Sequence, residues 1–182
     1  MRVIAGEARG RRLEALPGTD VTRPTLSQVK EAMFSIVQFD LPGARVLDLY
    51  AGSGQLGIEA LSRGAESAVF VERRKDALQA IRENLEACGF SDRARVVNGD
   101  AMSYLKSGEK FDLIFLDPPY ASGLLQQALE EIARFDICRR HGIIVAESAA
   151  DQALPPLSGS YSIYREYRYG KIKLTVYHRN ED

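Results

Sequence analysis

The sequence Asp48-Leu49-Tyr50-Ala51-Gly52-Ser53-Gly54-Gln55-Leu56-Gly57 joins an apolar strand to a helix through a glycine-rich turn, and it decides the fold prediction. Glycines let the backbone turn tightly and approach a ligand closely. Three of them, Gly52, Gly54 and Gly57, satisfy the G-x-G-x-x-G pattern of dinucleotide-binding loops. Glu72 ends the next apolar run, close to where an acidic residue is expected to bind a ribose hydroxyl. These features alone fit NAD as well as S-adenosylmethionine.

Asp48 distinguishes between these two ligands, because it stands just before the glycines. Its charge would repel a pyrophosphate bound by the loop, by about 4 kcal/mol at a distance of about 4 Å and an effective dielectric constant of about 20. S-adenosylmethionine instead carries an ammonium and a sulfonium, which a carboxylate stabilises directly or through water. The alternative is that Asp48 only caps the turn that follows it.

A further acidic position follows the third apolar run, in Asn98-Gly99-Asp100-Ala101. Asp100 is placed to accept a hydrogen bond from an adenine amine, and the backbone N–H of Ala101 can donate to a ring nitrogen. Asp100 equally suits the N-cap of the next helix, and both roles can coexist. The predicted cofactor-binding residues are Asp48, Tyr50, Gly52, Ser53, Gly54, Glu72, Asp100 and Ala101.

Five near-continuous apolar runs predict strands that are buried on both faces of a parallel sheet. They cover residues 45–49, 68–72, 94–97, 112–116 and 143–146. Between them, apolar residues recur at helical spacing over residues 78–88 and 125–135. Strands that alternate with helices predict an α/β fold with a doubly wound, Rossmann-like sheet. Residues 161–169 and 171–177 predict an antiparallel hairpin that turns at Gly170.

The N-terminal part carries a different pattern. Thr25 and Gln28 have the form of a capping box and predict a helix that begins after Pro24. Residues 2–16 predict a small hairpin around Gly6 to Gly10. We therefore divide the chain into an N-terminal basic hairpin extension, residues 1–24, and a main domain, residues 25–182.

Asp117-Pro118-Pro119-Tyr120 ends the fourth apolar run and is the most specific motif in the chain. Consecutive prolines lock two φ angles and lack N–H donors. The Asp117 carboxylate and a fixed carbonyl of this turn can then accept both hydrogens of an exocyclic amine. Tyr120 offers a flat face to a base removed from its stack. The alternative is an ordinary turn with a capping aspartate and a core tyrosine.

Methyl transfer to a nucleobase amine requires such an arrangement, because the nitrogen lone pair is delocalised into the ring. Hydrogen bonds from both N–H groups aim the lone pair at the methyl donor, and Asp117 stabilises the positive charge that develops on nitrogen. Alignment within about 3–3.5 Å supplies much of the remaining rate. No metal and no covalent intermediate are needed. The predicted catalytic residues are Asp117, Pro118, Pro119 and Tyr120.

Composition and charge exclude several classes of protein. With two cysteines in 182 residues, a disulfide scaffold and a zinc module are excluded. No apolar run reaches the roughly 20 residues of a membrane span, and the N-terminus lacks the pattern of a signal peptide, which predicts a cytoplasmic protein. The net charge is +3 over residues 1–30, −6 over 31–160 and +4 over 161–179. Basic ends favour contact with a polyanion, although solubilising lysines and arginines would give the same pattern.

With these motifs, the chain resembles the class I S-adenosylmethionine-dependent methyltransferases, and among them the bacterial family that methylates guanine N2 in small-subunit ribosomal RNA. The matching elements include Val3-Ile4-Ala5-Gly6, Arg9-Gly10-Arg11, Arg23-Pro24-Thr25, Ala51-Gly52-Ser53-Gly54, Asp117-Pro118-Pro119-Tyr120 and Leu174-Thr175-Val176-Tyr177. The resemblance implies a seven-stranded sheet with an antiparallel last hairpin, a methyltransferase domain over residues 25–182, and a cofactor over the carboxyl ends of the strands.

The resemblance also implies that Asp117 and Tyr120 hold the target guanine, and that the substrate is ribosomal RNA in the small subunit or a precursor. Arg9, Arg11, Arg12, Arg23 and Lys30 would contact phosphates, and a monomer is expected. Other functions fit parts of the pattern: amine methylation of DNA adenine or of a protein glutamine, a nicotinamide-dependent oxidoreductase, and a non-catalytic RNA-binding factor. An aspartate at position 117 does not identify the base by itself.

Overall fold

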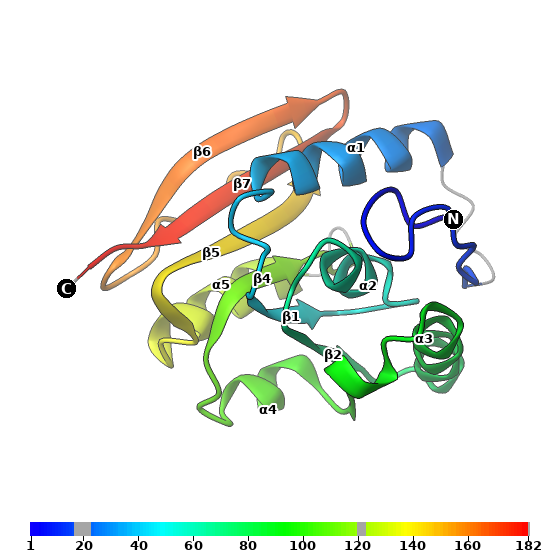
Figure 1. The fold of residues 1–182 in the computed structure, drawn as a ribbon. Coiled ribbons are helices and arrows are strands. Elements are labelled where there is room, and N and C mark those ends of the chain that lie inside the picture. The colour runs from blue at the N-terminus through cyan, green and yellow to red at the C-terminus, as the bar shows by residue number, and fades with distance from the viewer. Residues whose placement is uncertain (17–22, 120–122, 182) are drawn as a thin grey trace.

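The computed structural model describes residues 1–16, 23–119 and 123–181, and of residues 23–26 it describes the backbone alone. A seven-stranded sheet forms its centre, in the order β3-β2-β1-β4-β5-β7-β6 (Figure 1). The strands are β1 (Arg45–Leu49), β2 (Ser67–Glu72), β3 (Ala94–Asn98), β4 (Phe111–Leu116), β5 (Cys138–Ala149), β6 (Tyr161–Tyr169) and β7 (Ile172–Arg179). Strands β1 to β5 are parallel, and β7 is antiparallel to both of its neighbours. This confirms the predicted sheet and its C-terminal hairpin.

Helices cover both faces of the sheet (Figure 1). They are α1 (Arg23–Ile36), α2 (Gln55–Ser62), α3 (Lys75–Cys88), α4 (Ala101–Leu105) and α5 (Leu124–Arg134), with a 3-10 turn η1 (Ser91–Arg93). Val46 of β1 is buried under α1, α2 and α3, whereas Leu47 and Leu49 are buried under α4 and α5. Because both faces of the central strands β1, β2 and β4 are covered, most of their residues are apolar, as the sequence predicted. No helix in the described part of the chain is long and apolar enough to span a membrane.

The third glycine of the loop pattern has a packing role. Gly57 lies in α2, and a Cβ atom there would stand 2.3 Å from Cε1 of Phe70 on β2. Only glycine therefore allows α2 to lie this close to β2, which is the part that the last glycine of such a loop plays in doubly wound folds.

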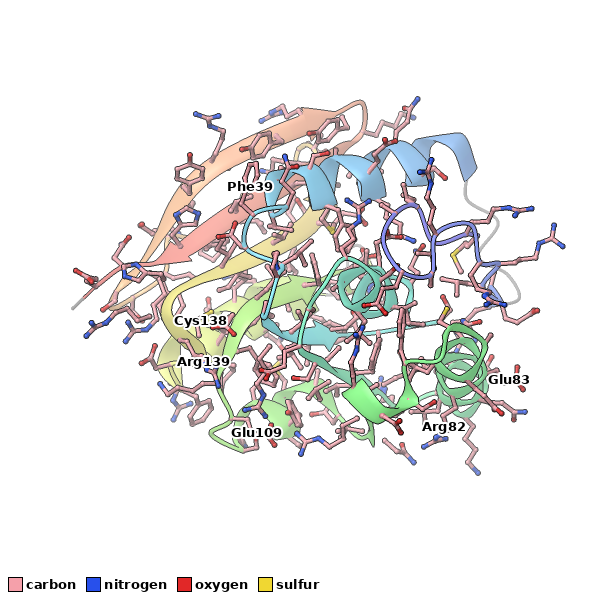
Figure 2. The ribbon with its side chains drawn as sticks, viewed as in Figure 1. Phe39, Arg82, Glu83, Glu109, Cys138 and Arg139 are labelled. Atoms are coloured by element: carbon pink, nitrogen blue, oxygen red, sulfur yellow. The ribbon has the colours of Figure 1, made fainter. Side chains whose placement is uncertain are left out.

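Strand β5 begins well before the predicted run at 143–146, at Cys138. Its first half contains Arg139, Arg140 and His141, all exposed, so it has no apolar pattern (Figure 2). A register shift against β4 interrupts the pairing in this half, and His141 has a φ of 63°. The polar residues are tolerated because the irregularity leaves their side chains in solvent.

Residues 1–16 fold back onto α2 and α3. The predicted hairpin forms, with one bridge between Arg2 and Arg12 and backbone hydrogen bonds between residues 1–3 and 10–13. Side chains far along the chain also hold the segment: the Glu59 carboxylate on α2 and the Asn84 amide oxygen on α3 both accept backbone N–H groups from it. These long-range contacts could not be predicted from local patterns.

Helix α1 begins at Arg23, so Thr25 lies inside the helix and the prediction of an N-cap at Thr25 was wrong. The cause is the proline: its fixed φ suits the first turn of a helix, where its missing N–H needs no partner. The division of the chain at residue 24 stays a prediction, and it falls within this helix.

Candidate active site

A cleft of about 1240 Å³ lies at the carboxyl ends of the central strands, where doubly wound sheets bind their ligands. Its walls come from the ends of β1 to β4, from β5, from α1 and from the turn between β6 and β7. Most of the predicted site residues line it, namely Tyr50, Gly52, Glu72, Asp100, Ala101, Asp117, Pro118 and Pro119. Tyr120 lies outside the described residues.

Asp48 does not line the cleft but lies behind its wall. It is buried, and its Oδ2 accepts the N–H of Gly57 at 3.0 Å, which fixes the first turn of α2. Burial raises the pKa of Asp48 well above its ordinary value, and the nearby carboxyl groups of Asp117 and Glu72 raise it further. The structure thus shows the turn-capping role for Asp48, and stabilisation of the cofactor by Asp48, directly or through water, stays a prediction.

Ser53 and Gly54 also support the loop from behind rather than lining the cleft. The Ser53 carbonyl accepts a hydrogen bond from Nδ2 of Asn84 at 3.0 Å. Gly54 has a φ of 84°, and a Cβ atom there would meet Ile81 and Phe70 at 3.3 Å. Both residues shape the turn that Tyr50 and Gly52 present to the cleft.

Glu72 holds the glycine loop against the end of β2. Its Oε2 accepts the N–H of Gly52 at 2.9 Å, and its Oε1 accepts the N–H groups of Arg73 and Arg74 at 3.0 and 3.1 Å. The Gly52 N–H is thus already bonded to a carboxylate. A loop in this state does not offer that N–H to a pyrophosphate, which argues against the dinucleotide alternative.

Asp100 caps α4, as the sequence allowed. Its Oδ2 accepts the N–H of Ser103 at 3.0 Å, and Ala101 is the first residue of the helix. Both residues still line the cleft, so capping leaves room for the second role.

Tyr50 is the strained residue of the loop, with a φ of 63°, a conformation that few non-glycine residues adopt. Its hydroxyl is buried and has no hydrogen-bond partner among the described residues. Burial, with the nearby Asp100 carboxylate, raises the pKa of Tyr50 to about 12. A neutral hydroxyl without a partner at a cleft wall suits a polar ligand atom.

Asp117 stands at the end of β4 and faces the cleft. Its carboxyl group hydrogen-bonds to that of Glu147 on the neighbouring strand β5. Burial raises the pKa of Asp117, and the hydrogen bond with Glu147 opposes this shift. Ionising two carboxyl groups in such contact in a buried place is costly, which favours a proton held between them.

Glu147 also lines the cleft, and sequence reasoning missed it. It follows the apolar run 143–146 directly, and no local motif marks it. The available signal was the register: Leu116 of β4 pairs with Ala146 of β5, so the residues that follow them, Asp117 and Glu147, stand side by side.

Acidic and basic side chains both line the cleft. The carboxyl groups of Glu72, Asp100, Asp117 and Glu147 line it, that of Asp48 lies directly behind it, and Arg73, Arg74 and Lys171 also belong to its walls. The carboxyl groups at the strand ends can stabilise a ligand with ammonium and sulfonium groups, whereas they would repel a pyrophosphate bound close to them. These carboxyl groups therefore fit S-adenosylmethionine better than NAD.

The basic residues fall into two groups. Arg9, Arg11 and Arg12 are exposed on the N-terminal segment, whose Leu16 reaches the rim of the cleft. Lys30 is instead buried, with its Nζ 3.1 Å from Oε1 of Glu59, so the prediction that Lys30 contacts phosphate is corrected. The Arg23 side chain lies outside the described atoms.

The sheet order, the antiparallel last hairpin and the cleft at the strand ends together define a class I methyltransferase fold. The chain belongs to the family described as Conserved hypothetical protein 95, whose model matches residues 1–178, and which includes the ribosomal RNA small subunit methyltransferases D.

Three relatives show how far the similarity extends. "Putative rRNA methyltransferase YlbH" of Bacillus subtilis is 41% identical over 97% of this chain and 98% of its own length. "Ribosomal RNA small subunit methyltransferase D" of Escherichia coli K12 is 34% identical over 98% of this chain and 90% of its own length. The solved structure "Putative methyltransferase yhhF from Escherichia coli" is 32% identical, covers 100% of this chain and 99% of its own, and has a TM-score of 0.88.

Proposed function

We propose that the protein transfers a methyl group from S-adenosylmethionine to the exocyclic N2 amine of a guanine in small-subunit ribosomal RNA, within the subunit or a precursor. The observation that carries the proposal is the position of Asp117-Pro118-Pro119 at the end of β4, on the same cleft as Glu72 and Asp100. The names of the relatives support ribosomal RNA as the substrate class. We infer that the protein acts in the cytoplasm, where ribosomal subunits assemble.

The end of the cleft formed by β1, β2 and β3 suits the cofactor. When bound, S-adenosylmethionine supplies a methyl group on a positively charged sulfur. Glu72 is placed for ribose hydroxyls, Asp100 for an adenine amine and the N–H of Ala101 for a ring nitrogen. The surrounding carboxyl groups complement the positive charge and leave the cofactor in an orientation set by fixed acceptors.

The residues after β4 hold the amine. The Asp117 carboxylate accepts one N–H of the target nitrogen, and a carbonyl of the diproline turn accepts the other. As the nitrogen gains positive charge, the carboxylate stabilises it without having to reorganise. Stacking of the base on Tyr120 stays a prediction, since that residue lies outside the described part of the chain.

The proposal predicts a specific product. Purified protein, incubated with S-adenosylmethionine carrying a deuterated methyl group and with small subunits from a strain that lacks the methyltransferase, is expected to produce deuterated N2-methylguanosine. Mass spectrometry of the digested RNA and protein measures this product and maps its position. If the deuterated methyl group appeared instead in N6-methyladenine or in a protein glutamine, the substrate would be one of the other amines. If NAD raised the melting temperature of the protein and S-adenosylhomocysteine did not, an oxidoreductase would be favoured.

We further propose that Arg9, Arg11 and Arg12 contact phosphates beside the cleft. Changing all three to Gln is expected to weaken binding to small subunits and to reduce the slope of log K against log salt by roughly 2 to 3, because each phosphate contact releases about 0.7–0.9 of a counterion. Fluorescence anisotropy over a salt series measures the slope.

A matched control changes Arg82, Arg134 and Arg140 to Gln, which are exposed elsewhere; Arg82 points from α3 into solvent (Figure 2). Equal slopes for the two triple variants would show that the N-terminal arginines serve only solubility.

A further inference from the structure

The cleft extends beyond the residues that suit the cofactor. Its other end is formed by β5 and by the turn between β6 and β7, where Glu147, Tyr169 and Lys171 line it. In the sheet order, β5 and β7 lie beyond β4, on the side away from β1, β2 and β3. This part of the cleft, on the far side of Asp117, is the space left for the target base.

Glu147 is the carboxyl group of this second end. It is 8% exposed, and it stands beside Asp117 because β4 and β5 are parallel and in register at Leu116 and Ala146. Both carboxyl groups line the same cleft, and they are close enough to hydrogen-bond to each other. The amine of guanine lies between two ring nitrogens, N1 and N3, and only N1 carries a hydrogen. A base whose amine is held by Asp117 can therefore present N1 to the Glu147 carboxylate.

That ring nitrogen differs between purines. In guanine, N1 beside the N2 amine carries a hydrogen, so N1 and the amine form a row of three N–H donors. In 2-aminopurine the same N2 amine stands beside an N1 that carries no hydrogen and can only accept. A buried carboxylate accepts hydrogen bonds and cannot satisfy a second acceptor unless it is protonated.

We propose that Glu147 is a specificity-determining residue that accepts the N1–H of the target guanine while Asp117 holds the N2 amine; this rests on the proposed function. On binding, the N–H donors of the base offset the cost of ionising both buried carboxyl groups, and a proton held between them passes to solvent. Glu147 then accepts the N1–H, while Asp117 and the diproline carbonyl accept the two N–H groups of the amine, so that every donor of this edge of guanine has an acceptor.

The test compares two bases and two proteins. Small-subunit RNA is prepared by ligation with either guanine or 2-aminopurine at the mapped position, reconstituted into subunits, and methylated at mildly alkaline pH. We expect the wild type to prefer guanine by roughly 100-fold or more in kcat/KM, since rejecting an analogue that leaves a buried polar group unpaired costs this much or more.

In Glu147→Gln, an amide N–H can donate to N1 of 2-aminopurine, so the preference is expected to fall to within about 10-fold or to reverse. The intrinsic reactivity of each base is the same for both proteins, so the change in preference reports on the N1 contact alone. Glu147→Asp, which keeps the carboxylate, should retain the preference for guanine at a lower rate. Glu130→Gln, on the exposed face of α5, is the matched control and should behave as the wild type.

Binding of S-adenosylhomocysteine, measured by calorimetry, should be unchanged in all variants, which shows that each is folded. If a folded Glu147→Gln protein keeps the preference for guanine over 2-aminopurine, the proposed role of Glu147 is overturned. The proposed function still stands in that case, provided that the wild type methylates guanine. A wild type that methylates 2-aminopurine as fast as guanine also overturns it. If the wild type makes no N2-methylguanosine, the proposed function fails and the inference fails with it.

Discussion

Asp117→Ala is expected to lower kcat for methyl transfer by roughly 100- to 1000-fold, the loss seen when one preorganised hydrogen-bonding group is removed from a charged transition state. The carboxylate is needed where charge develops on the target nitrogen, and the diproline turn alone supplies only a neutral carbonyl. The affinity for S-adenosylhomocysteine should stay close to that of the wild type, because the residues placed for it lie after β2 and β3. Single-turnover kinetics and calorimetry measure the two quantities separately.

Two further variants define the origin of this loss. Asp117→Asn keeps an acceptor oxygen but removes the negative charge, so its rate should lie between those of the wild type and Asp117→Ala. Glu72→Gln, on the opposite side of the cleft, should weaken cofactor binding more than the chemical step. A folded Asp117→Ala protein with full activity would eliminate the mechanism.

Asp117→Ala should leave the fold stable. The pKa of Asp117 is raised in the folded protein, so the folded state holds the proton more tightly than the unfolded chain does. Such a group adds stability below the pKa of the unfolded chain, and this contribution is lost as the pH rises toward the folded pKa. Neutral pH lies above the ordinary pKa of an aspartate, where this contribution is already declining, so removal of the carboxyl group is expected to lower the melting temperature little.

The sheet was predictable because its physical cause is local. Strands β1, β2 and β4 are covered on both faces and β3 lies at the sheet edge, yet all four are mainly apolar runs whose predicted limits agree with the structure to within a residue or so. The first half of β5 was missed since Arg139 and Arg140 point into solvent at an irregular pairing. A pattern of burial cannot reveal a strand half that is not buried.

The site was predictable only where its residues follow a strand in sequence. Glu72, Asp100 and Asp117 each stand at the end of an apolar run, so parallel strands had to bring them to one edge. Glu147 enters the site through the register between β4 and β5, which no single stretch of sequence contains. The sequence predicts a carboxylate at the start of the loop, at Asp48. That this carboxylate lies buried beneath the loop depends on how α2 packs against the sheet, which the local sequence does not reveal.

Lys30 shows that the surroundings of a charged residue, too, cannot be predicted from local sequence. From sequence, a lysine in a basic N-terminal region predicts contact with a polyanion. In the structure it is buried against Glu59, a residue in a helix that the sequence places well apart from it. Whether a lysine faces solvent or a carboxylate depends on packing between helices rather than on the charge of its own segment.

Glu59 itself is the buried charge that fixes the N-terminal segment. Its side chain is fully buried, with Oε1 3.1 Å from Nζ of Lys30 and Oε2 2.8 Å from Nε of Arg63. The same carboxylate accepts the backbone N–H groups of Ile4 at 2.8 Å and Ala5 at 3.0 Å. Burial alone would raise the pKa of Glu59, but these four partners hold it below its ordinary value.

Glu59→Ala is expected to lower the free energy of unfolding by about 3–5 kcal/mol, measured by urea denaturation. The substitution leaves the Lys30 ammonium buried without its partner and removes the acceptor of two backbone N–H groups. Since a domain of ordinary stability unfolds at a cost of about 5–15 kcal/mol, this single change would remove a large share of it.

Two comparisons separate the buried charge from side-chain loss in general. Asp76→Asn breaks an exposed ion pair with Arg74 and should unfold at the urea concentration of the wild type. Glu59→Leu combined with Lys30→Met should recover part of the loss, because no unpaired charge then remains buried. Recovery should be incomplete, since Ile4 and Ala5 still lack an acceptor. A Glu59→Ala protein within about 1 kcal/mol of the wild type would mean that the segment is held by its apolar contacts instead.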